Sequence, residues 1–217
     1  MEISNVETLF DKTLQESKLT AKQQAVLKVS LNLFAEKGFD GTSTSEIAKQ
    51  AGVSEGTVFK QFKTKDGILA ALLNPFLDQV VPMAATEFLT EVKDQRFDVL
   101  AAFFNYVIKD RMTFAIANQK QLRILVQEII RNSDMIQSFV DKIVSRVLNT
   151  FGKSLQIFKD RGALVDWPTE RIIRYFLGVA GSYIVPAVLI GKASQLDIDK
   201  SCQEATEFLV RGLTPIK

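Results

Sequence analysis

Helical periodicity restricts the fold of this chain more than any other feature of its sequence. Apolar residues recur at intervals of three and four along almost the whole chain, and this spacing gives a helix one apolar face. No β-hairpin signal is present, because Asp40-Gly41 and Asp66-Gly67 both precede predicted helices rather than joining alternating runs. Only five prolines occur in 217 residues. The sequence therefore predicts an all-α fold.

The predicted helices form a small N-terminal bundle followed by a larger one. The short helices are expected at residues 22–37, 44–51, 55–61 and 66–73. The longer helices are expected at residues 76–92, 96–115, 119–131, 134–160, 168–190 and 196–212. Pro75 is expected to separate residues 66–73 from the next helix and, together with Pro82, to let the chain bend there.

Boundary signals support the short helices. Gly38 and Gly52 suit the left-handed conformation that commonly ends a helix. Ser43 and Ser54 are predicted N-caps, because a serine oxygen can accept a hydrogen bond from a free amide of the first turn. Ser43 with Glu46 also matches a capping box, in which the glutamate side chain returns to the amide of the cap residue.

Composition excludes several classes of active site. The chain has no His and one Cys, so it lacks the commonest general base and metal ligand and cannot form an intramolecular disulfide or a cysteine zinc site. We therefore expect no enzyme activity, no metal and no cofactor. The 27 basic residues against 25 acids give a net charge of +2, which is too small to indicate a polyanionic partner by itself.

Targeting signals are also missing from the sequence. Residues 1–17 carry four acids against one Lys and have no apolar run, unlike a secretory signal. Residues 175–191 are uncharged, but they are shorter than the roughly 20 residues of a spanning helix and contain Pro186. We expect a buried packing helix and a soluble, cytoplasmic protein without membrane contact. A membrane-associated helical protein is the alternative.

A helix-turn-helix motif is predicted between residues 44 and 61. Ala48 and Ala51 supply small side chains where the two helices cross, Gly52 suits the sharp turn, and Val53 supplies an apolar plug after it. The helix at 55–61 begins with small and polar residues, as a helix that enters the major groove requires.

The motif and its surroundings resemble one known family. Residues 22–73 are similar to the DNA-binding region of the TetR (tetracycline-repressor) family, and the resemblance covers about fifty of 217 residues. The matching residues are Leu33-Phe34-Ala35-Glu36-Lys37-Gly38-Phe39, Thr42-Ser43, Ile47-Ala48, Ala51-Gly52-Val53-Ser54, Gly56-Thr57, Phe59, Phe62 and Lys65-Asp66.

This resemblance implies a fold and a function. It implies an Ω-shaped homodimer whose three N-terminal helices bind DNA and whose variable C-terminal domain binds a ligand. Most relatives repress transcription until a small molecule releases them. The implied division is an N-terminal extension at residues 1–19, a DNA-binding domain at 20–66, and a ligand-binding and dimerisation domain at 67–217. The predicted fold class is therefore all-α, with an N-terminal three-helix helix-turn-helix DNA-binding bundle and a larger C-terminal helical domain for ligand binding and dimerisation.

The predicted DNA contacts differ from the family pattern at one position. Relatives commonly have Tyr where this chain has Phe59, which lacks the hydroxyl that usually touches the DNA backbone. The first Arg of the chain is Arg96, so guanine readout by a bidentate arginine is not available to the motif. The predicted DNA-binding residues are Thr44, Ser54, Glu55, Gly56, Thr57, Phe59, Lys60, Gln61 and Lys65. Of these, Lys60 is expected to read guanine and Gln61 adenine, with Thr44 or Thr57 offering a hydroxyl or methyl group.

Charge gives this assignment modest support. Residues 1–17 hold one Lys against four acids, whereas residues 18–67 hold eight Lys against five acids. Ordinary solvated lysines would give the same count. Together with the motif, however, the excess favours phosphate contacts by Lys60 and Lys65.

The larger domain is rich in phenylalanine, which predicts an aromatic-lined cavity for an apolar effector. Each Phe taken singly could equally be a core residue. The predicted ligand-binding residues are Phe103, Tyr106, Phe114, Arg123, Gln127 and Phe139. The sequence does not choose among the polar candidates in this set.

The C-terminal helices are the predicted dimer interface. The apolar face of residues 168–190 is wide, and Gly178 and Gly181 allow close approach of another helix. Residues 196–212 are expected to add Ala205, Phe208, Leu209 and Cys202 to the interface. A twofold interface would bury this surface, and a twofold dimer predicts a near-palindromic operator in double-stranded DNA.

The sequence thus predicts a dimeric, sequence-specific DNA-binding transcriptional regulator. We expect a repressor that a small, largely hydrophobic effector releases from its operator. The alternative is an all-α protein that sequesters hydrophobic ligands and does not bind DNA. Salt-dependent binding to duplex DNA separates the two.

Overall fold

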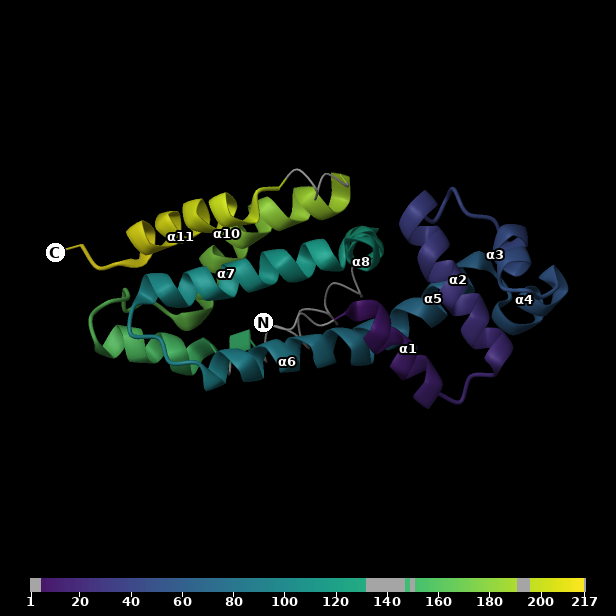
Figure 1. Cartoon of the computed structure of the whole chain (residues 1–217), viewed down its shortest axis with the longest axis horizontal. Helices are drawn as coiled ribbons and strands as arrows, with labels where there is room; N and C mark the ends of the chain where they lie inside the picture. The colour runs from purple at the N-terminus through teal and green to yellow at the C-terminus, as the bar shows by residue number, and fades with distance from the viewer. Residues whose placement is uncertain (1–4, 132–146, 149–150, 191–195, 217) are drawn as a thin grey trace. The chain divides into compact units, whose positions relative to one another are not determined.

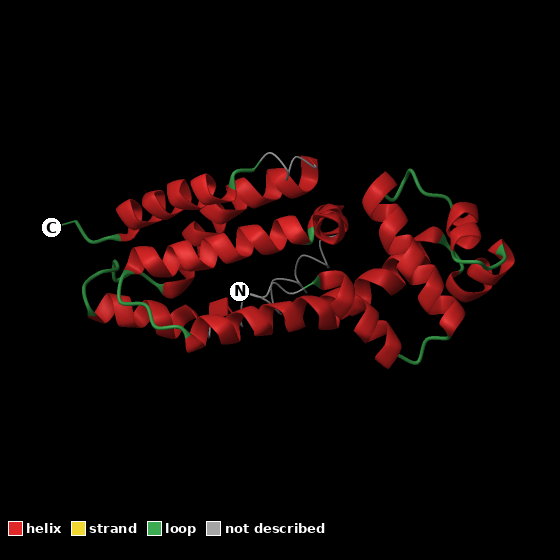
Figure 2. Ribbon diagram, in the orientation of Figure 1, coloured by secondary structure: helices red, strands yellow, loops and turns green. Residues whose placement is uncertain are grey.

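The structure contains helices and the loops that connect them (Figure 2). This computed structural model describes residues 5–131, 147–148, 151–190 and 196–216, and no strand occurs among them. The all-α prediction is confirmed. The Cα positions divide the chain into two compact units. The first unit comprises Ser4–Ala84 and Lys120–Met135, and the second comprises Met1–Ile3, Ala85–Gln119 and Ile136–Lys217.

The helices follow the predicted order (Figure 1). The first stretch of chain forms α1 (Val6–Glu16), α2 (Ala21–Lys37), α3 (Thr44–Gln50), α4 (Glu55–Phe62), α5 (Lys65–Pro75), the π-helical turn η1 (Phe76–Val80) and α6 (Val81–Asp94). The remainder forms α7 (Leu100–Ala117), α8 (Gln119–Arg131), α10 (Thr169–Ile190) and α11 (Ile198–Leu213). Residues 151–160 are also helical, whereas most of the predicted helix at 134–160 lies outside the described residues.

Apolar faces of α2 to α5 form the core of the first unit. Leu27 and Phe34 of α2 are buried, as are Ile47 of α3, Val58 of α4 and Ile68 of α5. These residues recur at helical spacing, so each helix buries one face and leaves the other to solvent. The core therefore fixes how α3 and α4 cross.

Helix α1 was missed by the sequence analysis, which expected no helix before residue 22. Asn5 caps it by accepting a hydrogen bond from the Thr8 amide at 3.0 Å. Its buried Phe10 packs against Phe76 of η1 with ring centroids 4.8 Å apart. Because isolated helices of this length are marginal in water, α1 depends on this packing more than on its own propensity.

Pro75 does not end a helix, so this prediction was wrong. Residues 65–94 form one helical run of 30 residues with Pro75 inside it. A proline has no amide hydrogen and its ring crowds the preceding turn, and here the backbone accommodates it by widening into η1. The Val81 amide donates to the carbonyl of Phe76, five residues earlier, which is the π-helical pattern.

Two smaller predictions also need correction. Helix α7 begins at Leu100 rather than residue 96, with Val99 as an extended N-cap residue. Ser43 does cap α3, accepting from the Glu46 amide at 3.1 Å. The Glu46 carboxylate, however, forms an ion pair with Lys37 of α2 instead of completing a capping box. The complete capping box lies at Thr20 and Gln23, at the start of α2.

Helix α7 packs against α10 and α11 in the second unit (Figure 1). Phe103 and Phe104 of α7 are fully buried, and so is Phe158 of the helix at 151–160. The rings of Phe103 and Phe158 lie 5.7 Å apart. The core of this unit is therefore aromatic.

Two helical stretches are long and apolar enough to cross a membrane by length and composition, Lys65–Asp94 and Thr169–Ile190. Buried helices of soluble proteins pass the same test. Half of the apolar window in the first stretch is buried, but only 28% of the window in the second. The apolar surface of α10 therefore needs a separate explanation.

Candidate functional site

The turn between α3 and α4 has the geometry of a helix-turn-helix. Gly52 adopts a φ of 67°, a left-handed conformation that costs a glycine little. The Val53 amide donates to the carbonyl of Ala48 at 3.0 Å, which closes the turn. Ile47 and Ala48 are buried behind it. The small and apolar residues of the motif therefore serve the roles expected from the sequence.

The first turn of α4 is tied together by its cap. The Ser54 hydroxyl oxygen accepts from the Thr57 amide at 3.2 Å and lies 2.8 Å from the Thr57 hydroxyl. Ser54, Glu55 and Gly56 are exposed, and Thr57 is partly buried. This turn presents a small, polar surface to solvent, as a recognition helix requires.

Gly56 has no packing role inside the molecule. A Cβ atom placed there would meet nothing closer than the Ser54 hydroxyl oxygen at 3.9 Å. Gly67 is the contrast, because its Cβ would lie 2.0 Å from the Phe62 carbonyl oxygen. The fold therefore requires glycine at position 67, whereas at position 56 it would accept alanine.

The middle of α4 carries one cation and one exposed ring. Phe59 is 48% exposed and Lys60 is exposed beside it. Gln61 is only partly exposed, and its side-chain carbonyl oxygen is buried without a hydrogen-bond partner among the described residues. Lys60 and Gln61 were both predicted to contact bases. The Lys60 ammonium is the more accessible of the two side chains.

Two other predicted DNA contacts already have partners in the protein. The Thr44 hydroxyl donates to the Glu55 carboxylate at 2.9 Å. The Lys65 ammonium donates to the carbonyls of Phe39 and Thr42 at 2.8 and 3.0 Å and lies 4.3 Å from the centroid of the Phe39 ring. Lys65 therefore holds the segment after α2 in place.

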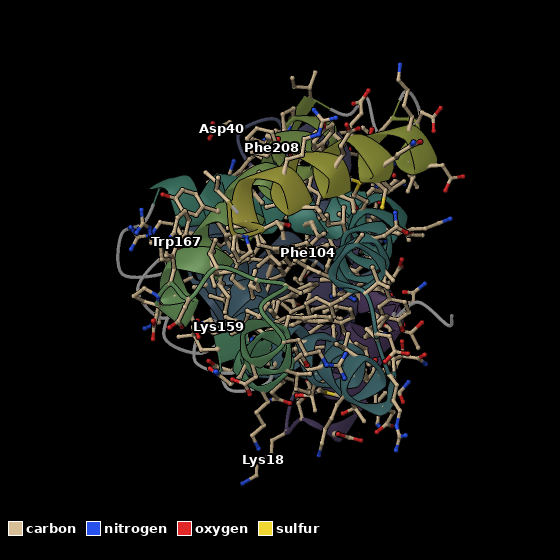
Figure 3. The ribbon with its side chains drawn as sticks, turned by 90° about the vertical axis from the view of Figure 1, so that its left-hand side faces the viewer. Lys18, Asp40, Phe104, Lys159, Trp167 and Phe208 are labelled. Atoms are coloured by element: carbon tan, nitrogen blue, oxygen red, sulfur yellow. The ribbon has the colours of Figure 1, made fainter. Side chains whose placement is uncertain are left out.

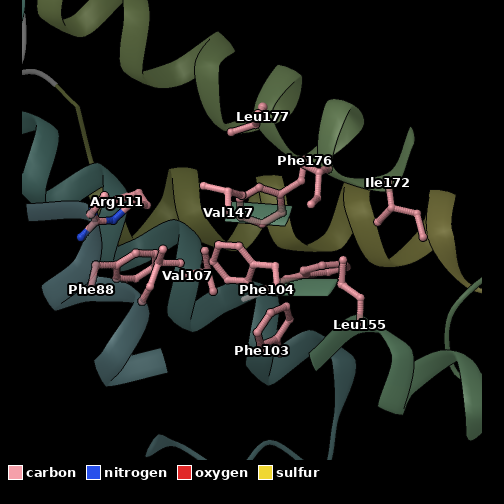
Figure 4. Close-up of a pocket in the computed structure, with 14 residues that line it drawn as sticks. Phe88, Phe103, Phe104, Val107, Arg111, Val147, Leu155, Ile172, Phe176 and Leu177 are labelled. Carbon is pink, nitrogen blue, oxygen red and sulfur yellow. The ribbon is translucent and has the colours of Figure 1, made fainter. Parts of the chain in front are cut away.

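The second unit contains an apolar cavity of about 180 Å³ (Figure 4). The charged side chain of Arg111 lies beside Phe88 at one end of the cavity in Figure 4, whereas the aliphatic side chains of Ile172 and Leu155 lie at the other end. Aromatic and aliphatic side chains from α6, α7, α10 and the helix at 151–160 make most of the lining. The lining residues are Ala85, Phe88, Leu89, Phe103, Phe104, Val107, Arg111, Val147, Phe151, Leu155, Ile172, Ile173, Phe176 and Leu177.

Arg111 is the charged residue among those that line the cavity. Its guanidinium lies over the Phe88 ring, 3.7 Å from the centroid, and its Nε donates to the Asp110 carboxylate at 2.8 Å. Burial lowers the pKa of Arg111, and the neighbouring Asp110 carboxylate opposes this effect. Because Asp110 compensates the positive charge, the cavity suits a ligand group that is neutral and apolar.

The predicted ligand residues are only partly brought together. Phe103 lines the cavity. Tyr106 instead faces a surface hollow shared with Glu91, and burial and this carboxylate raise the pKa of Tyr106. Phe114 lies 4.7 Å from the Arg111 guanidinium but not in the lining. Arg123 and Gln127 belong to α8 in the first unit, and Phe139 lies outside the described residues.

Sequence reasoning missed most of the lining on α7. Phe104, Val107 and Arg111 are spaced by three and four residues, so they share one helix face. That spacing is visible in the sequence. However, Phe103 and Tyr106 follow equally good helical spacings, and packing decides which face borders the cavity.

Helices α10 and α11 expose a set of large apolar side chains. Leu177 is 50% exposed and Phe208 is 67% exposed, and Figure 3 shows Phe208 on the outer helix α11 and Phe104 in the interior. Tyr175, Val185 and Ile190 of α10 are also exposed. A Cβ atom placed on Gly178 or Gly181 would meet nothing within 4 Å, so the backbone of α10 is open to a neighbour.

Among the described residues, no group of three or more His, Cys, Asp or Glu side chains could hold a metal ion. The candidate sites are thus the exposed face of α4 and the apolar cavity of the second unit. The exposed face of α4 has the geometry of a DNA-recognition helix, and the apolar cavity has the lining of a ligand pocket.

Comparison with known proteins finds a family match over the helix-turn-helix segment. Residues 26–72 match the family described as "Bacterial regulatory proteins, tetR family". The "Fatty acid metabolism regulator protein" of Bacillus subtilis is 29% identical over 119 residues, which are 51% of this chain and 61% of that protein. The chain thus aligns with less than two thirds of this relative.

Solved structures share the fold over most of the chain. A TetR-family regulator from Mesorhizobium loti superposes with a TM-score of 0.66 at 17% identity, covering 92% of this chain and 100% of that one. FadR from Bacillus subtilis, solved in complex with stearoyl-CoA, gives a TM-score of 0.60 at 20% identity, covering 87% and 97%. The motif residues and the family match identify residues 26–72 as a helix-turn-helix segment like that of the tetR family of bacterial regulatory proteins, and the chain as a whole shares the fold of these solved structures.

Proposed function

We propose that the protein is a homodimeric, cytoplasmic repressor that leaves its operator when an aliphatic effector occupies the second-unit cavity. The observation that carries this proposal is the apolar cavity of about 180 Å³ in a chain that also presents a helix-turn-helix. A regulator without a ligand would have no need of such a space, since protein interiors are otherwise close-packed.

The DNA-binding part of the proposal rests on the exposed face of α4. Lys60 contacts phosphate or guanine, Phe59 packs on a thymine methyl or a sugar, and Gly56 lets the helix approach closely. Ser54, Glu55 and Thr57 lie at the N-terminal end of α4, where Thr44 contacts Glu55, whereas Gln61 lies in the last turn of the helix. Residues 20–66 would then be the DNA-binding domain and residues 67–217 the effector and dimerisation domain.

The effector part rests on the chemistry of the cavity lining. Apolar side chains and a compensated Arg111–Asp110 pair favour burial of an aliphatic chain. The Bacillus subtilis relative is named for fatty acid metabolism, and a solved neighbour of the same fold holds stearoyl-CoA. Both names favour an effector that contains an aliphatic chain.

The dimer part rests on the exposed apolar face of α10 and α11. Large apolar side chains such as Leu177 and Phe208 are exposed in the single chain, and a second copy of the same helices would cover such side chains by twofold symmetry. This interface also explains why α10 resembles a membrane helix in composition.

Selection of bound sequences from a random duplex pool, repeated with aliphatic alcohols added, tests the proposal. We expect a near-palindromic sequence whose affinity falls with salt and which the alcohol releases. Each neutralised phosphate contributes about 0.9 to the logarithmic salt slope. Lys60→Ala should weaken binding, whereas Lys12→Ala, an exposed position on α1, should not.

Two outcomes would contradict the proposal. If no duplex is enriched and the alcohol still binds, the protein sequesters hydrophobic ligands instead. If a duplex is enriched and no aliphatic ligand changes its affinity, the cavity does not hold the effector.

A further inference from the structure

A second hollow lies beside the apolar cavity in the same unit. It measures about 730 Å³ and lies between the end of α6, the segment after it and the helix at 151–160. In contrast to the cavity, it is rimmed by charged side chains. We call it the basic groove.

Positive charge dominates the basic groove. Lys93, Arg96, Lys153 and Arg161 line it, against Asp98 as the one acid in the lining. Asp98 is 92% exposed at its side chain and lies 3.8 Å from Arg161, which makes a weak, solvated ion pair. Within the described residues, no ion pair engages the other three cations. The groove therefore holds uncompensated positive charge.

Aromatic side chains also line the basic groove, and one of them, Phe103, lines the apolar cavity as well. Figure 4 shows Phe103 below Phe104 at the edge of the cavity. Phe97 packs edge-on against Phe103 at 5.4 Å, and Phe158 lies 5.7 Å from it. On the helix at 151–160, Leu155 lines the cavity and its neighbour Ser154 lines the groove.

We propose that the basic groove binds a phosphate-type anion, the head group of an effector whose aliphatic part occupies the apolar cavity. This inference rests on the proposed function for the aliphatic part only. A phosphate group carries nearly two negative charges and three acceptor oxygens, so it can engage several cations at once. Arginine adds paired donors that match its geometry, and the Ser154 hydroxyl supplies a further donor.

Arg111 does not provide an equivalent head-group site. Asp110 already accepts from its Nε, and Phe88 covers its guanidinium face. An anion brought to Arg111 would also meet the buried Asp110 carboxylate. The groove is therefore the better place for a phosphate.

Three probes separate the two hollows: dodecanol as tail alone, pyrophosphate as anion alone, and dodecyl phosphate as both. Calorimetric titration of the full chain measures each affinity. We expect dodecyl phosphate to bind at least about tenfold more tightly than dodecanol, since one charge-assisted hydrogen bond already gives a factor of this size. Pyrophosphate binding as tightly as dodecyl phosphate would identify a free phosphate compound as the source of the anion and would still support the groove.

Charge reversal locates the anion. Arg96→Glu/Lys153→Glu should abolish the preference for dodecyl phosphate and leave dodecanol affinity within about twofold. The neutral variant Arg96→Gln/Lys153→Gln should lose part of the preference for dodecyl phosphate. It also serves as a control for misfolding of the charge-reversed variant. The matched control is Lys12→Glu/Lys18→Glu, which makes the same charge change at exposed positions of the first unit and should keep the preference.

Each failure has a distinct meaning. Equal affinity of the wild-type protein for dodecyl phosphate and dodecanol, with no pyrophosphate binding, overturns the anion site but not the proposed function. A preference that survives both groove variants and disappears in Arg111→Met also overturns it, because the head group would then be read inside the cavity. If the wild-type protein binds pyrophosphate but not dodecanol, the anion site in the basic groove is supported and the aliphatic effector is contradicted.

Discussion

Lys65 illustrates how one residue can serve the fold where the sequence suggested a contact with DNA. It lies in the segment that resembles the family, next to the motif, and any exposed lysine there is a candidate for phosphate contact. In the structure its ammonium instead donates to the carbonyls of Phe39 and Thr42. This bridge joins the start of α5 to the segment that follows α2.

The first prediction follows from this bridge. Lys65→Met should lower the free energy of unfolding by about 1–3 kcal/mol, because two partly buried carbonyls lose a charged donor. Urea unfolding measures the change, and Lys49→Met at an exposed position of α3 is the control. A neutral effect on stability together with a salt slope lower by about one would show that Lys65 serves the DNA instead.

Gly56 gives the second prediction. Gly56→Ala should raise the stability by up to about 1 kcal/mol, because alanine is the better helix former and its Cβ meets nothing within 3.9 Å. Operator binding should nevertheless become weaker, since the methyl group would occupy the space where DNA approaches α4. If Gly56→Ala raises both the stability and the operator affinity, DNA does not approach α4 closely at this position.

At residue scale, the sequence predicted well where local geometry decides. The left-handed Gly52 and the Ser54 cap follow from turn and capping chemistry alone. The sequence predicted poorly the side-chain contacts that depend on a residue far away along the chain. The bridge of Lys65 to Thr42 spans 23 positions, and the pairing of Glu46 with Lys37 displaced the expected capping box.

Helix α1 shows the same limit at the scale of an element. Its residues Val6, Phe10, Thr13 and Leu14 are buried, but the surrounding charges of this segment obscured their spacing in the sequence. The π-helical turn after Pro75 is similar, because it depends on how a continuous helix relaxes around a proline. Local propensity predicts neither, since packing between Phe10 and Phe76 supports both elements.

The third prediction tests whether α1 is part of the fold. Phe10→Ala should destabilise the first unit by about 3–5 kcal/mol, since it leaves a cavity at a fully buried ring. Thr8→Ala, at an exposed position of the same helix, should change stability by less than about 0.5 kcal/mol. Equal effects of the two substitutions in urea unfolding would mean that α1 does not pack against η1 in solution.

The fourth prediction concerns α11 and its exposed ring. Phe208→Glu should convert the proposed dimer to a monomer while the helix content stays unchanged, because the ring is 67% exposed in the single chain and a charge would be buried in the proposed interface. Gln203→Glu on the same helix, also exposed, is the control. Sedimentation analysis gives the oligomeric state, and a Phe208→Glu variant that remains dimeric would place the interface elsewhere.

For the molecule as a whole, the all-α class, the order of helices and the family could be predicted from periodicity and the motif. The cavity lining could not, because neighbouring faces of α7 carry equally apolar residues and only the packing of α10 and the helix at 151–160 selects one. The wide apolar face of α10 was visible in the sequence, but whether a second chain covers it depends on an interaction outside the single chain.

The central claim is that the cavity and the helix-turn-helix are coupled, and one titration tests it most directly. An aliphatic effector is titrated against the free protein and against its complex with the selected operator. Linkage requires that an effector which weakens DNA binding is itself bound more weakly by the complex, by the same factor, with about 5- to 150-fold as the usual range. We expect this reciprocal loss of affinity. Equal effector affinity for the free protein and the complex would contradict it.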